Sequence, residues 1–497
     1  MLFAQGLSTI HVRLGDVVTF LFLFGLCLLL SGLGGEQQYR AAALIELDDS
    51  ITTSPSPEED YLERLSERYG LTNQTRWQAW RIQPSGQQDG ESSLTAVGLK
   101  FASQSHKIVD LRGPKQSDLR ATKLMTLPAR DMARHDETNA SDFLFGVSTS
   151  YERLADGNWA VLRAWARWLT RRATESNGGG LVVMLDRATD KQLQEVDDRL
   201  HAVGLDAYLL STDEPMSMAK RYYELVRIFK TYGATLAATG QRKTWFALVD
   251  DSVFFPGLTS LRQRLATHDS EDELYMGLLP GQKSRGGGVM LMTRRAVDRV
   301  PGLPCTEAPA ETPARPKRWD ALLRECVEQR AGRDVHVLPV PYDHDDDDDS
   351  DDNEDNDGLS VTRPLVLRDR PHRLDVGMAH LVTDVCGEAC FMQRFLFRDD
   401  WLLVNGVSIS HHPDGLKRLS HHHHHHHRRH AAQDMRLTWT GRRRLWRLLD
   451  STSSPDGSVW QAYLKRGEAS EGQGDETDEM DSIIVLIWGR RRTLGSR

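Results

Sequence analysis

From residue 141 onwards, short apolar runs alternate with longer amphipathic stretches. Four of the runs predict strands, of which the first two are expected to be buried: "FLFGV", "GGGLVVMLD", "DAYLLST" and "TWFALVDD". Between them, "WAVLRAWARWLTRRA", "DKQLQEVDDRLHAVG" and "MAKRYYELVRIFKTYGATL" have apolar residues at helical spacing. Strands that alternate with helices predict an α/β fold, in which helices cover both faces of a parallel or mixed sheet. Ligands of such sheets bind beyond the carboxyl ends of the strands.

The apolar pattern is weaker on both sides of this block. Downstream, "LYMGLL" predicts a further short strand, a glycine loop follows at 286–288, and "RWDALLRECVEQR" predicts a helix. Tryptophan-rich runs around "SPDGS" predict β-hairpins in a small β-rich C-terminal part. Upstream, residues 36–140 are turn-rich and polar, which predicts a partly disordered stem.

The N-terminus carries an uncharged apolar run, "VVTFLFLFGLCLLLSGLGG", at residues 17–35. Its length is close to the roughly 20 residues that span a bilayer. Arg13 precedes the run and Glu36 follows it, which favours a single-pass type II signal anchor with the C-terminal body in a lumen. A cleaved signal peptide is the alternative, because "LLSGLGG" also fits a weak cleavage site.

These patterns divide the chain into consecutive parts. We predict a cytosolic tail at 1–16, a transmembrane anchor at 17–35, a stem at 36–140, a catalytic domain at 141–342 and 359–419, an acidic disordered insertion at 343–358, a His-rich insertion at 420–432, and a β-rich C-terminal extension at 433–497. Runs of like charge are usually solvated loops, so the acidic run and the histidine run as such are assigned no chemical role.

Charge and cysteine content narrow the class of protein. A net charge of −9 argues against a general nucleic-acid binder, which has a basic balance. The cysteines outside the apolar run form an even set that permits two disulfides in an oxidising lumen: Cys305, Cys326, Cys386 and Cys390. The sequence leaves their pairing open. Sequons at Asn73 and Asn139 fit the same compartment.

Asp250 and Asp251 directly follow the fourth predicted strand, in "WFALVDDSVFFPG". Adjacent carboxylates repel each other unless something positive lies between them. They can hold a divalent cation that bridges the diphosphate of a sugar nucleotide, bind magnesium in phosphoryl transfer, or cap the next helix. An all-oxygen site suits Mn²⁺ or Mg²⁺. The sequence has no GxSxG, HExxH or Walker-type phosphate loop, so a hydrolase or phosphotransferase has no supporting motif.

The order and spacing of several motifs resemble the Fringe-like β-1,3-glycosyltransferases, and their fungal relatives in particular. "WFALVDDSVFFP" matches the family's strand-and-acid pattern without gaps, and "YMG" and "RGGGVMLM" follow where the family has a Tyr-x-Gly element and a glycine loop. "FLFGVSTSYERL", "CGEACFMQRFLFRDDWLLVNGVSISHHPDG" and "WRLLDSTSSPDGSVWQAYLKR" also resemble these proteins. The resemblance covers about residues 140–490.

The resemblance implies a glycosyltransferase fold of type A in the Golgi membrane. It implies inverting transfer of a sugar from a UDP-sugar to a hydroxyl of a glycan or glycoprotein. The divalent metal, Mn²⁺ or Mg²⁺, is expected at Asp250, Asp251, Ser252 and His344, and the donor site at Asp250, Gly286, Gly287 and Gly288. "WDALLREC" matches the segment that carries the family's base, so Asp320 is the expected base, with a helix N-cap as its alternative role.

The chain departs from the family pattern next to the acids. Ser252 replaces the third acid of the triplet, and Arg285 stands where the glycine loop has a glycine. A hydroxyl is a poorer ligand for a divalent cation than a carboxylate. Two hypotheses follow: an active glycosyltransferase, or a descendant that keeps the fold and binds nucleotide-sugar or glycan without turnover. Ser252 is the feature that separates them.

Overall fold

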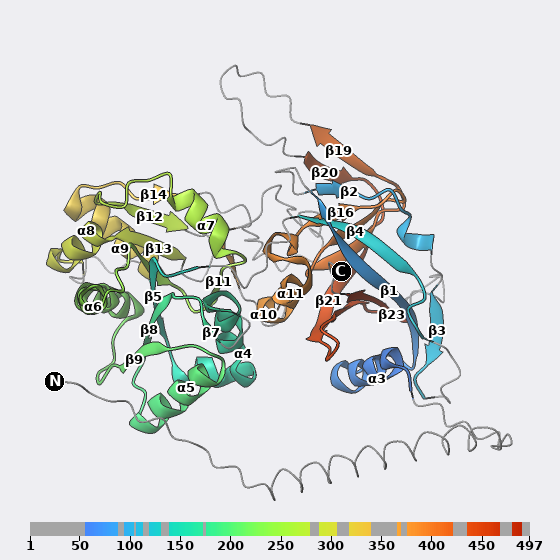
Figure 1. Ribbon diagram of the computed structural model, residues 1–497, viewed down its shortest axis with the longest axis horizontal. Helices are drawn as coiled ribbons and strands as arrows, with labels where there is room; N and C mark the ends of the chain where they lie inside the picture. The colour runs from blue at the N-terminus through green and yellow to red at the C-terminus, as the bar shows by residue number, and fades with distance from the viewer. Residues whose placement is uncertain are drawn as a thin grey trace, which may run out of the picture. The chain divides into compact units, whose positions relative to one another are not determined.

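The structure is a computed structural model of the chain (Figure 1). It describes residues 55–87, 94–103, 106–112, 119–130, 139–171, 175–278, 288–305, 318–338, 365–368, 375–420, 435–467 and 480–489. The expected anchor at 17–35, the acidic insertion, the His-rich insertion beyond residue 420, Gly286, Gly287 and His344 lie outside these ranges. No helix within them is both long and apolar enough to cross a bilayer.

One of the two large sheets contains the predicted α/β block. Its seven strands are ordered β14-β12-β13-β10-β5-β8-β9. Strands β10, β5, β8 and β9 run parallel, whereas β13 runs antiparallel to both β10 and β12. The mixed α/β sheet is therefore confirmed. The bounds are β5 Phe143–Thr149, β8 Gly180–Leu185, β9 Ala207–Ser211, β10 Trp245–Val249, β12 Tyr275–Leu278, β13 Val289–Thr293 and β14 His336–Val337.

Strand β13 is an addition to the predicted elements, because the sequence indicated only a loop and a helix after "LYMGLL". All five of its residues are buried. It lies between β10 and β12, so both of its edges are paired. Periodicity alone does not distinguish a short apolar run that forms a buried strand from one that forms a buried helical segment.

Alternate side chains of β10 pack on opposite faces of this sheet. Trp245, Ala247 and Val249 share a core cluster with α4, α5 and α7, whereas Phe246 and Leu248 share another with α6, α8 and α9. Successive side chains of a strand point to opposite faces, so a continuous apolar run fits a strand with helices on both sides. The helices are α4 Tyr151–Leu169, α5 Asp190–Ala202, α6 Met218–Ala238, α7 Leu258–Leu265, α8 Arg294–Arg299 and α9 Trp319–Cys326.

Polar residues explain where three of these helices begin. Ser150, Thr189 and Ser217 are the N-caps of α4, α5 and α6, and each side chain accepts a hydrogen bond from a first-turn amide. Such a bond satisfies one of the four amides that a helix start leaves unpaired. Helix α4 is interrupted at residues 156–159, whose backbone angles are not helical.

The other large sheet has ten strands and combines residues from both ends of the described chain. Its order is β2-β16-β17-β18-β21-β22-β23-β1-β3, and β4 pairs with β1. Strand β1 runs parallel to β23, which lies some 400 residues later. The bounds are β1 Gln74–Gln87, β2 Leu94–Ala96, β3 Lys107–Asp110, β4 Leu124–Arg130, β16 Arg394–Leu396, β17 Trp401–Val404, β18 Ser408–His411, β21 Arg444–Ser453, β22 Val459–Lys465 and β23 Asp481–Trp488.

Much of the region that the sequence describes as a stem therefore folds together with the C-terminal strands. Helix α3, Pro57–Tyr69, begins with a capping box between Ser56 and Glu59. Tyr61 of this helix donates a 2.9 Å hydrogen bond to Asp450 Oδ2 in β21. The reason the sequence does not reveal this arrangement is that parallel pairing of β1 with β23 depends on a contact far away in the chain.

Short elements complete the described structure. They are β6 Thr170–Arg171, β7 Glu175–Ser176, β11 Val253–Phe254, β15 Leu367–Arg368, β19 Leu416–Ser420, β20 Met435–Trp439, α10 Val376–Ala379, α11 Thr383–Cys386, the 3-10 helices η1 Phe101–Ser103, η3 Val300–Gly302, η6 His380–Val382 and η7 Glu388–Cys390, and a π-helical turn, η4 Val327–Ala331.

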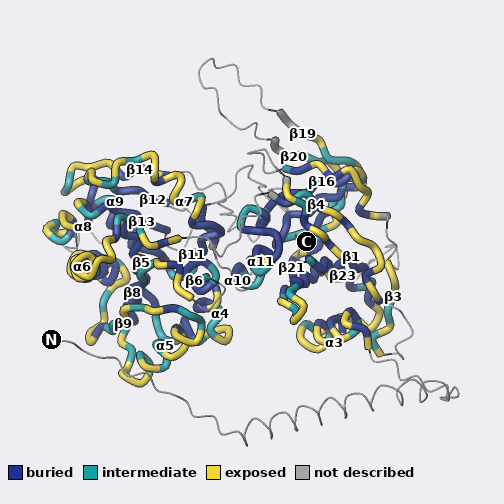
Figure 2. Tube along the Cα trace, in the orientation of Figure 1, coloured by how far each residue is buried: buried dark blue, intermediate teal, exposed yellow. Residues whose placement is uncertain are grey.

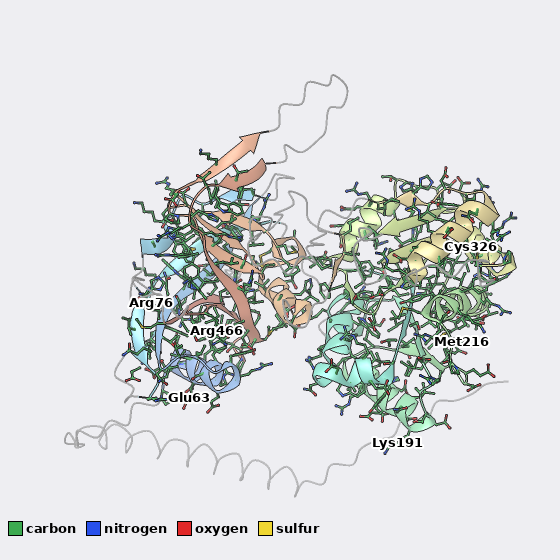
Figure 3. The ribbon with its side chains drawn as sticks, turned by 180° about the vertical axis from the view of Figure 1, so that it is seen from behind. Glu63, Arg76, Lys191, Met216, Cys326 and Arg466 are labelled. Carbon is green, nitrogen blue, oxygen red and sulfur yellow. A yellow bond between two sulfur atoms is a disulfide. The ribbon has the colours of Figure 1, made fainter. Side chains whose placement is uncertain are left out.

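Two disulfides join the four cysteines that the sequence assigned to a lumen. Cys305 pairs with Cys326, and Cys386 pairs with Cys390. Figure 3 labels Cys326, at the end of α9. The first bridge connects the segment after η3 to α9, and the second connects the last residue of α11 to the last residue of η7.

We expect Cys305→Ser to lower the free energy of unfolding by about 3 kcal/mol, because the Cys305–Cys326 bridge closes a loop of about 20 residues in the unfolded chain. The Cys386–Cys390 bridge closes a far shorter loop, so Cys386→Ser is the matched variant and should lower the free energy of unfolding by only about 2 kcal/mol. Denaturant unfolding without reductant measures both. An equal loss at the two bridges contradicts the loop-length explanation.

Candidate active site at the switch point of the sheet

The connections of the seven-stranded sheet reverse direction between β5 and β10. From β5 the chain continues outward through β8 to β9, and it then returns to place β10 on the other side of β5 (Figure 1). Both central strands are buried along their length (Figure 2). Ligands of open α/β sheets bind at the carboxyl ends of the strands where this reversal occurs. Asp250 and Asp251 follow β10 directly, and so they lie at this point.

Asp251 is held across the switch point by residues that follow β5. Thr149 Oγ1 donates a 2.5 Å hydrogen bond to Asp251 Oδ2. Arg153 Nε, in the first turn of α4, lies 3.9 Å from the same oxygen. Asp251 Oδ1 accepts no hydrogen bond from the described residues, so it is the oxygen that the site presents to a ligand.

Asp250 is more deeply buried and is held within its own turn. Ser252 donates to Asp250 Oδ1 twice, from Oγ at 2.6 Å and from its backbone N–H at 3.2 Å. The Asp250 N–H donates to the carbonyl of Gly288 at 3.1 Å. In this structure the Ser252 hydroxyl therefore orients an acid, while its oxygen keeps lone pairs for a cation. We refer to residues 250–256 as the acid loop.

The electrostatics of the pair favour a positive partner. Burial raises the pKa of the Asp251 carboxyl, and the charge of Asp250 raises it further, while Thr149 and Arg153 act in the opposite direction. Tyr222 lies beneath the pair and donates a 2.8 Å hydrogen bond to the Val249 carbonyl. Burial and then the charges of Asp250 and Asp251 raise the pKa of Tyr222 well above its ordinary range.

We expect Asp251→Asn to raise the melting temperature of the metal-free protein at neutral pH. Because the folded pKa of Asp251 lies above its unfolded value, the folded state binds the proton more tightly, and stability falls as pH rises through that interval. Thermal unfolding in a chelator at about pH 4 and about pH 7 measures the effect. The increase in melting temperature should be smaller at the lower pH, where the wild-type carboxyl is also largely protonated. A gain of equal size at both pH values contradicts it.

The carboxylate oxygens of Asp250 and Asp251 suit a hard divalent cation that also binds the phosphates of a substrate. Within the described ranges there is no group of three or more His, Cys, Asp or Glu residues that could hold a metal ion. Mg²⁺ and similar ions are commonly held by one or two carboxylates together with substrate phosphates and waters. Asp250 and Asp251 supply such a pair. The raised pKa of Asp251 means that burial and the charge of Asp250 destabilise its ionised form, and a bound cation would stabilise that form.

Asp320 is close to the acid pair, but its carboxylate is engaged with four donors. Arg318 donates from Nε to Oδ1 at 3.0 Å and from Nη2 to Oδ2 at 2.8 Å. The backbone N–H of Ala321 donates to Oδ1, and that of Gly288 donates to Oδ2 at 3.2 Å. Asp320 is fully buried, so a role as base requires one of these donors to move.

The Gly288 peptide connects this carboxylate to the acid loop. Its N–H donates to Asp320, and its carbonyl accepts from the backbone N–H of Asp250. The structure thus brings three predicted site residues together: Asp250, Gly288 and Asp320. The N-cap of α9 is Arg318 rather than Asp320, so the alternative capping role is wrong, although Asp320 does accept from a first-turn amide.

The sequence prediction did not include several polar residues at the same edge of the sheet. Arg221 of α6 donates to Ser148 Oγ at 2.8 Å, and its Nη1 lies 3.2 Å from Asp186 Oδ2. Figure 3 labels Met216, whose carbonyl also accepts from Arg221. Ser148, Thr149 and Asp186 each stand at the end of a buried strand, the same signal that identified Asp250. That signal would have found them.

No protein-family model matches this sequence, and no curated protein matches it. Among solved structures, similarity is found to a glycosyltransferase involved in glycosylation of the major capsid of PBCV-1, with 13% identity over 39% of this chain and 81% of that chain, at a TM-score of 0.23. The glycosyltransferase GlyE of Streptococcus pneumoniae TIGR4 is 12% identical over 40% of this chain and 45% of its own, at 0.26. Its apo form is 11% identical over 41% and 46%, at 0.24.

This chain thus spans less than half of the GlyE structures, and likenesses of this size carry no argument about its reaction or substrate. The resemblance to the Fringe-like family stays a prediction from the sequence motifs.

Proposed function

We propose that this protein is a metal-dependent glycosyltransferase that transfers a sugar from a UDP-sugar to a hydroxyl of a glycan or glycoprotein, with inversion. The observation that carries the proposal is the acid pair at the switch point, where a second carboxylate and burial raise the pKa of Asp251. Such a pair is poorly stable alone and suits a cation-bound diphosphate. The motif resemblance is the basis for a UDP-sugar as the donor and for the β-1,3-type linkage.

In this proposal Asp250 and Asp251 hold Mn²⁺ or Mg²⁺, with Ser252 and His344 as further contacts. The metal would neutralise the charge of the departing UDP. Thr149 and Arg153 fix the direction of the Asp251 carboxylate.

Two parts of the site would then act on the substrates. Gly286, Gly287 and Gly288 would line the donor site with Asp250. Asp320 would take the proton of the acceptor hydroxyl after one of its four donors has moved.

The location that we propose is the Golgi membrane. The protein would be a single-pass type II protein, with residues 17–35 in the bilayer and the rest in the lumen. An oxidising lumen is consistent with the Cys305–Cys326 and Cys386–Cys390 disulfides.

A second candidate function is binding of nucleotide-sugar or glycan without turnover. Two observations favour it: the third acid is Ser252, and the four donors of Asp320 leave the expected base fully engaged. This candidate predicts UDP binding without UDP release.

Titration of the full-length protein with UDP-sugars, with and without Mn²⁺, separates the two candidates. An active transferase binds UDP in a Mn²⁺-dependent way and releases UDP when an acceptor is supplied. Binding without release supports the second candidate. If UDP is neither bound nor released with any divalent metal, the transferase proposal is wrong, and of the second candidate only glycan binding is left.

A further inference from the structure

The acid loop leaves the switch point through a short and deeply buried segment. Val253 and Phe254 form β11, which pairs antiparallel with Arg368 and Leu367 of β15. Phe254 and Phe255 are fully buried. The ladder is only two residues long on each side, so the carbonyls beyond it need other partners to fix the loop.

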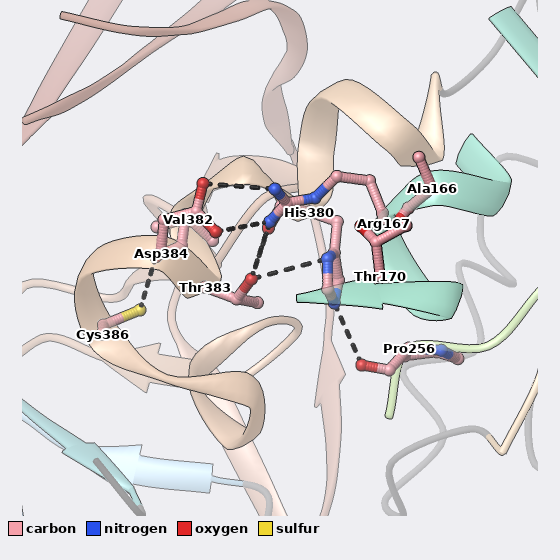
Figure 4. Close-up of polar contacts among 9 residues, drawn as sticks. All are labelled: Ala166, Arg167, Thr170, Pro256, His380, Val382, Thr383, Asp384 and Cys386. Atoms are coloured by element: carbon pink, nitrogen blue, oxygen red, sulfur yellow. Dashed lines mark hydrogen bonds and ion pairs between the residues drawn. The ribbon is translucent and has the colours of Figure 1, made fainter. Parts of the chain in front are cut away.

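His380 supplies such a partner from a segment 124 residues after Pro256. It is fully buried in η6, and its Nε2 lies 3.1 Å from the carbonyl oxygen of Pro256, the last residue of the acid loop (Figure 4). A carbonyl only accepts, so this contact assigns the ring proton to Nε2. The ring also meets Phe254 edge-on, with centroids 5.1 Å apart.

His380 is itself fixed to the helix that starts at the switch point. Arg167 of α4 donates from Nη2 to the His380 carbonyl at 3.2 Å and to Thr383 Oγ1 at 3.1 Å. The same guanidinium forms a two-pronged pair with Asp384, at 2.7 and 3.2 Å (Figure 4). A fork of this kind restricts direction as well as distance.

The backbone packing around this network is equally close. A Cβ on Gly377 of α10 would stand 3.2 Å from Ala164 Cα of α4, so a larger residue would fit only if one of the two helices moved by a few tenths of an ångström. The acid loop is therefore connected to α4 in two ways. At one end of the loop, Asp251 contacts Arg153 of α4 and Thr149, which ends β5 just before α4. At the other end, Pro256 contacts His380, whose carbonyl accepts a hydrogen bond from Arg167 of α4.

We propose that His380 is a positioning residue for the acid loop. By holding the Pro256 carbonyl it sets the direction in which Asp250 and Asp251 present their oxygens to a cation. An effect of His380 on catalysis rests on the proposed function, whereas the contact by which His380 holds the acid loop does not. Groups that orient metal ligands typically contribute about 10- to 100-fold to metal affinity.

The experiment compares three variants of the full-length protein. His380→Leu removes the donor, His380→Asn shortens the side chain so that its amide no longer reaches Pro256, and His380→Gln keeps an N–H near the Nε2 position. His412→Leu is the matched control, because His412 is similarly buried and directly follows β18 of the other large sheet, where the Ser410 hydroxyl contacts it. The readouts are amide hydrogen exchange of residues 250–258 and UDP affinity with Mn²⁺.

Leucine and asparagine at position 380 should speed exchange in the acid loop roughly tenfold, as expected for one lost hydrogen bond, and weaken Mn²⁺-dependent UDP binding about 10- to 100-fold. Glutamine should recover most of both, and the control should change neither. Unchanged exchange with leucine and asparagine, or no recovery with glutamine, overturns the proposal. If exchange speeds up but the wild-type protein binds no UDP with Mn²⁺, the proposed function fails and the hold on the loop stands.

Discussion

Asp251→Ala is expected to lower the Mn²⁺-dependent affinity for UDP by more than about 100-fold, which is about 3 kcal/mol of binding free energy. Asp251 Oδ1 accepts no hydrogen bond in the described part of the chain, so it is the oxygen that we expect to contact the metal in the proposed site. The alanine also removes a carboxylate whose pKa is raised by burial and by Asp250. The metal-free protein should therefore lose no stability, although it loses the ligand.

Isothermal titration with UDP and Mn²⁺, combined with thermal unfolding of the same samples, tests this separation. Asp198→Asn is the matched control, because it removes one acid from an exposed position on α5. It should leave UDP affinity unchanged. Binding by Asp251→Ala that equals the wild type would show that Asp251 does not hold the metal.

Ser252→Asp tests the same site in the opposite direction. In the structure the Ser252 hydroxyl donates to Asp250 Oδ1, so an aspartate there replaces a donor with a third negative charge. Without metal this should lower stability, because three carboxylates then repel one another. With Mn²⁺ it should tighten metal affinity, since a carboxylate is a stronger ligand than a hydroxyl.

The sequence could locate the acid pair because the relevant signal is local. A buried parallel strand is a continuous apolar run, and its first polar residue marks the end of the sheet where ligands bind. The runs of β5, β8 and β10 carry that signal and are buried along almost all of their length, whereas β9, at the edge of the sheet, is only partly buried. The position of Asp250 and Asp251 at one edge follows from those strands.

The sequence could not reveal features that depend on distant contacts. The pairing of β1 with β23 joins residues about 400 positions apart, and nothing in either strand specifies its partner. The approach of His380 to Pro256 has the same origin, because a lone histidine in an apolar segment has many alternatives. The four donors of Asp320 come from three residues, and the Gly288 amide reaches it only because β13 is a strand.

The second large effect is expected at Asp320, where alanine should lower the free energy of unfolding by about 3–5 kcal/mol. The substitution removes both acceptors of the Arg318 fork in a site where Asp320 is fully buried. It also leaves the backbone N–H of Gly288 without its carboxylate. Denaturant unfolding measures the loss. The Arg324–Glu328 pair next to α9 provides the control, because Glu328→Ala breaks an exposed i,i+4 pair worth less than about 1 kcal/mol.

Asp320→Asn distinguishes a structural carboxylate from a base. The amide keeps the shape and one acceptor, so it should cost less stability than alanine, about 1–3 kcal/mol. If Asp320 is the base, the folded asparagine variant binds UDP normally but loses turnover by about 100- to 10,000-fold. If its role is to hold Gly288, and through it the Asp250 backbone, UDP affinity falls together with stability. Four donors already occupy the carboxylate, and a base needs an open lone pair for the proton it takes, so the first result also requires one of these donors to move.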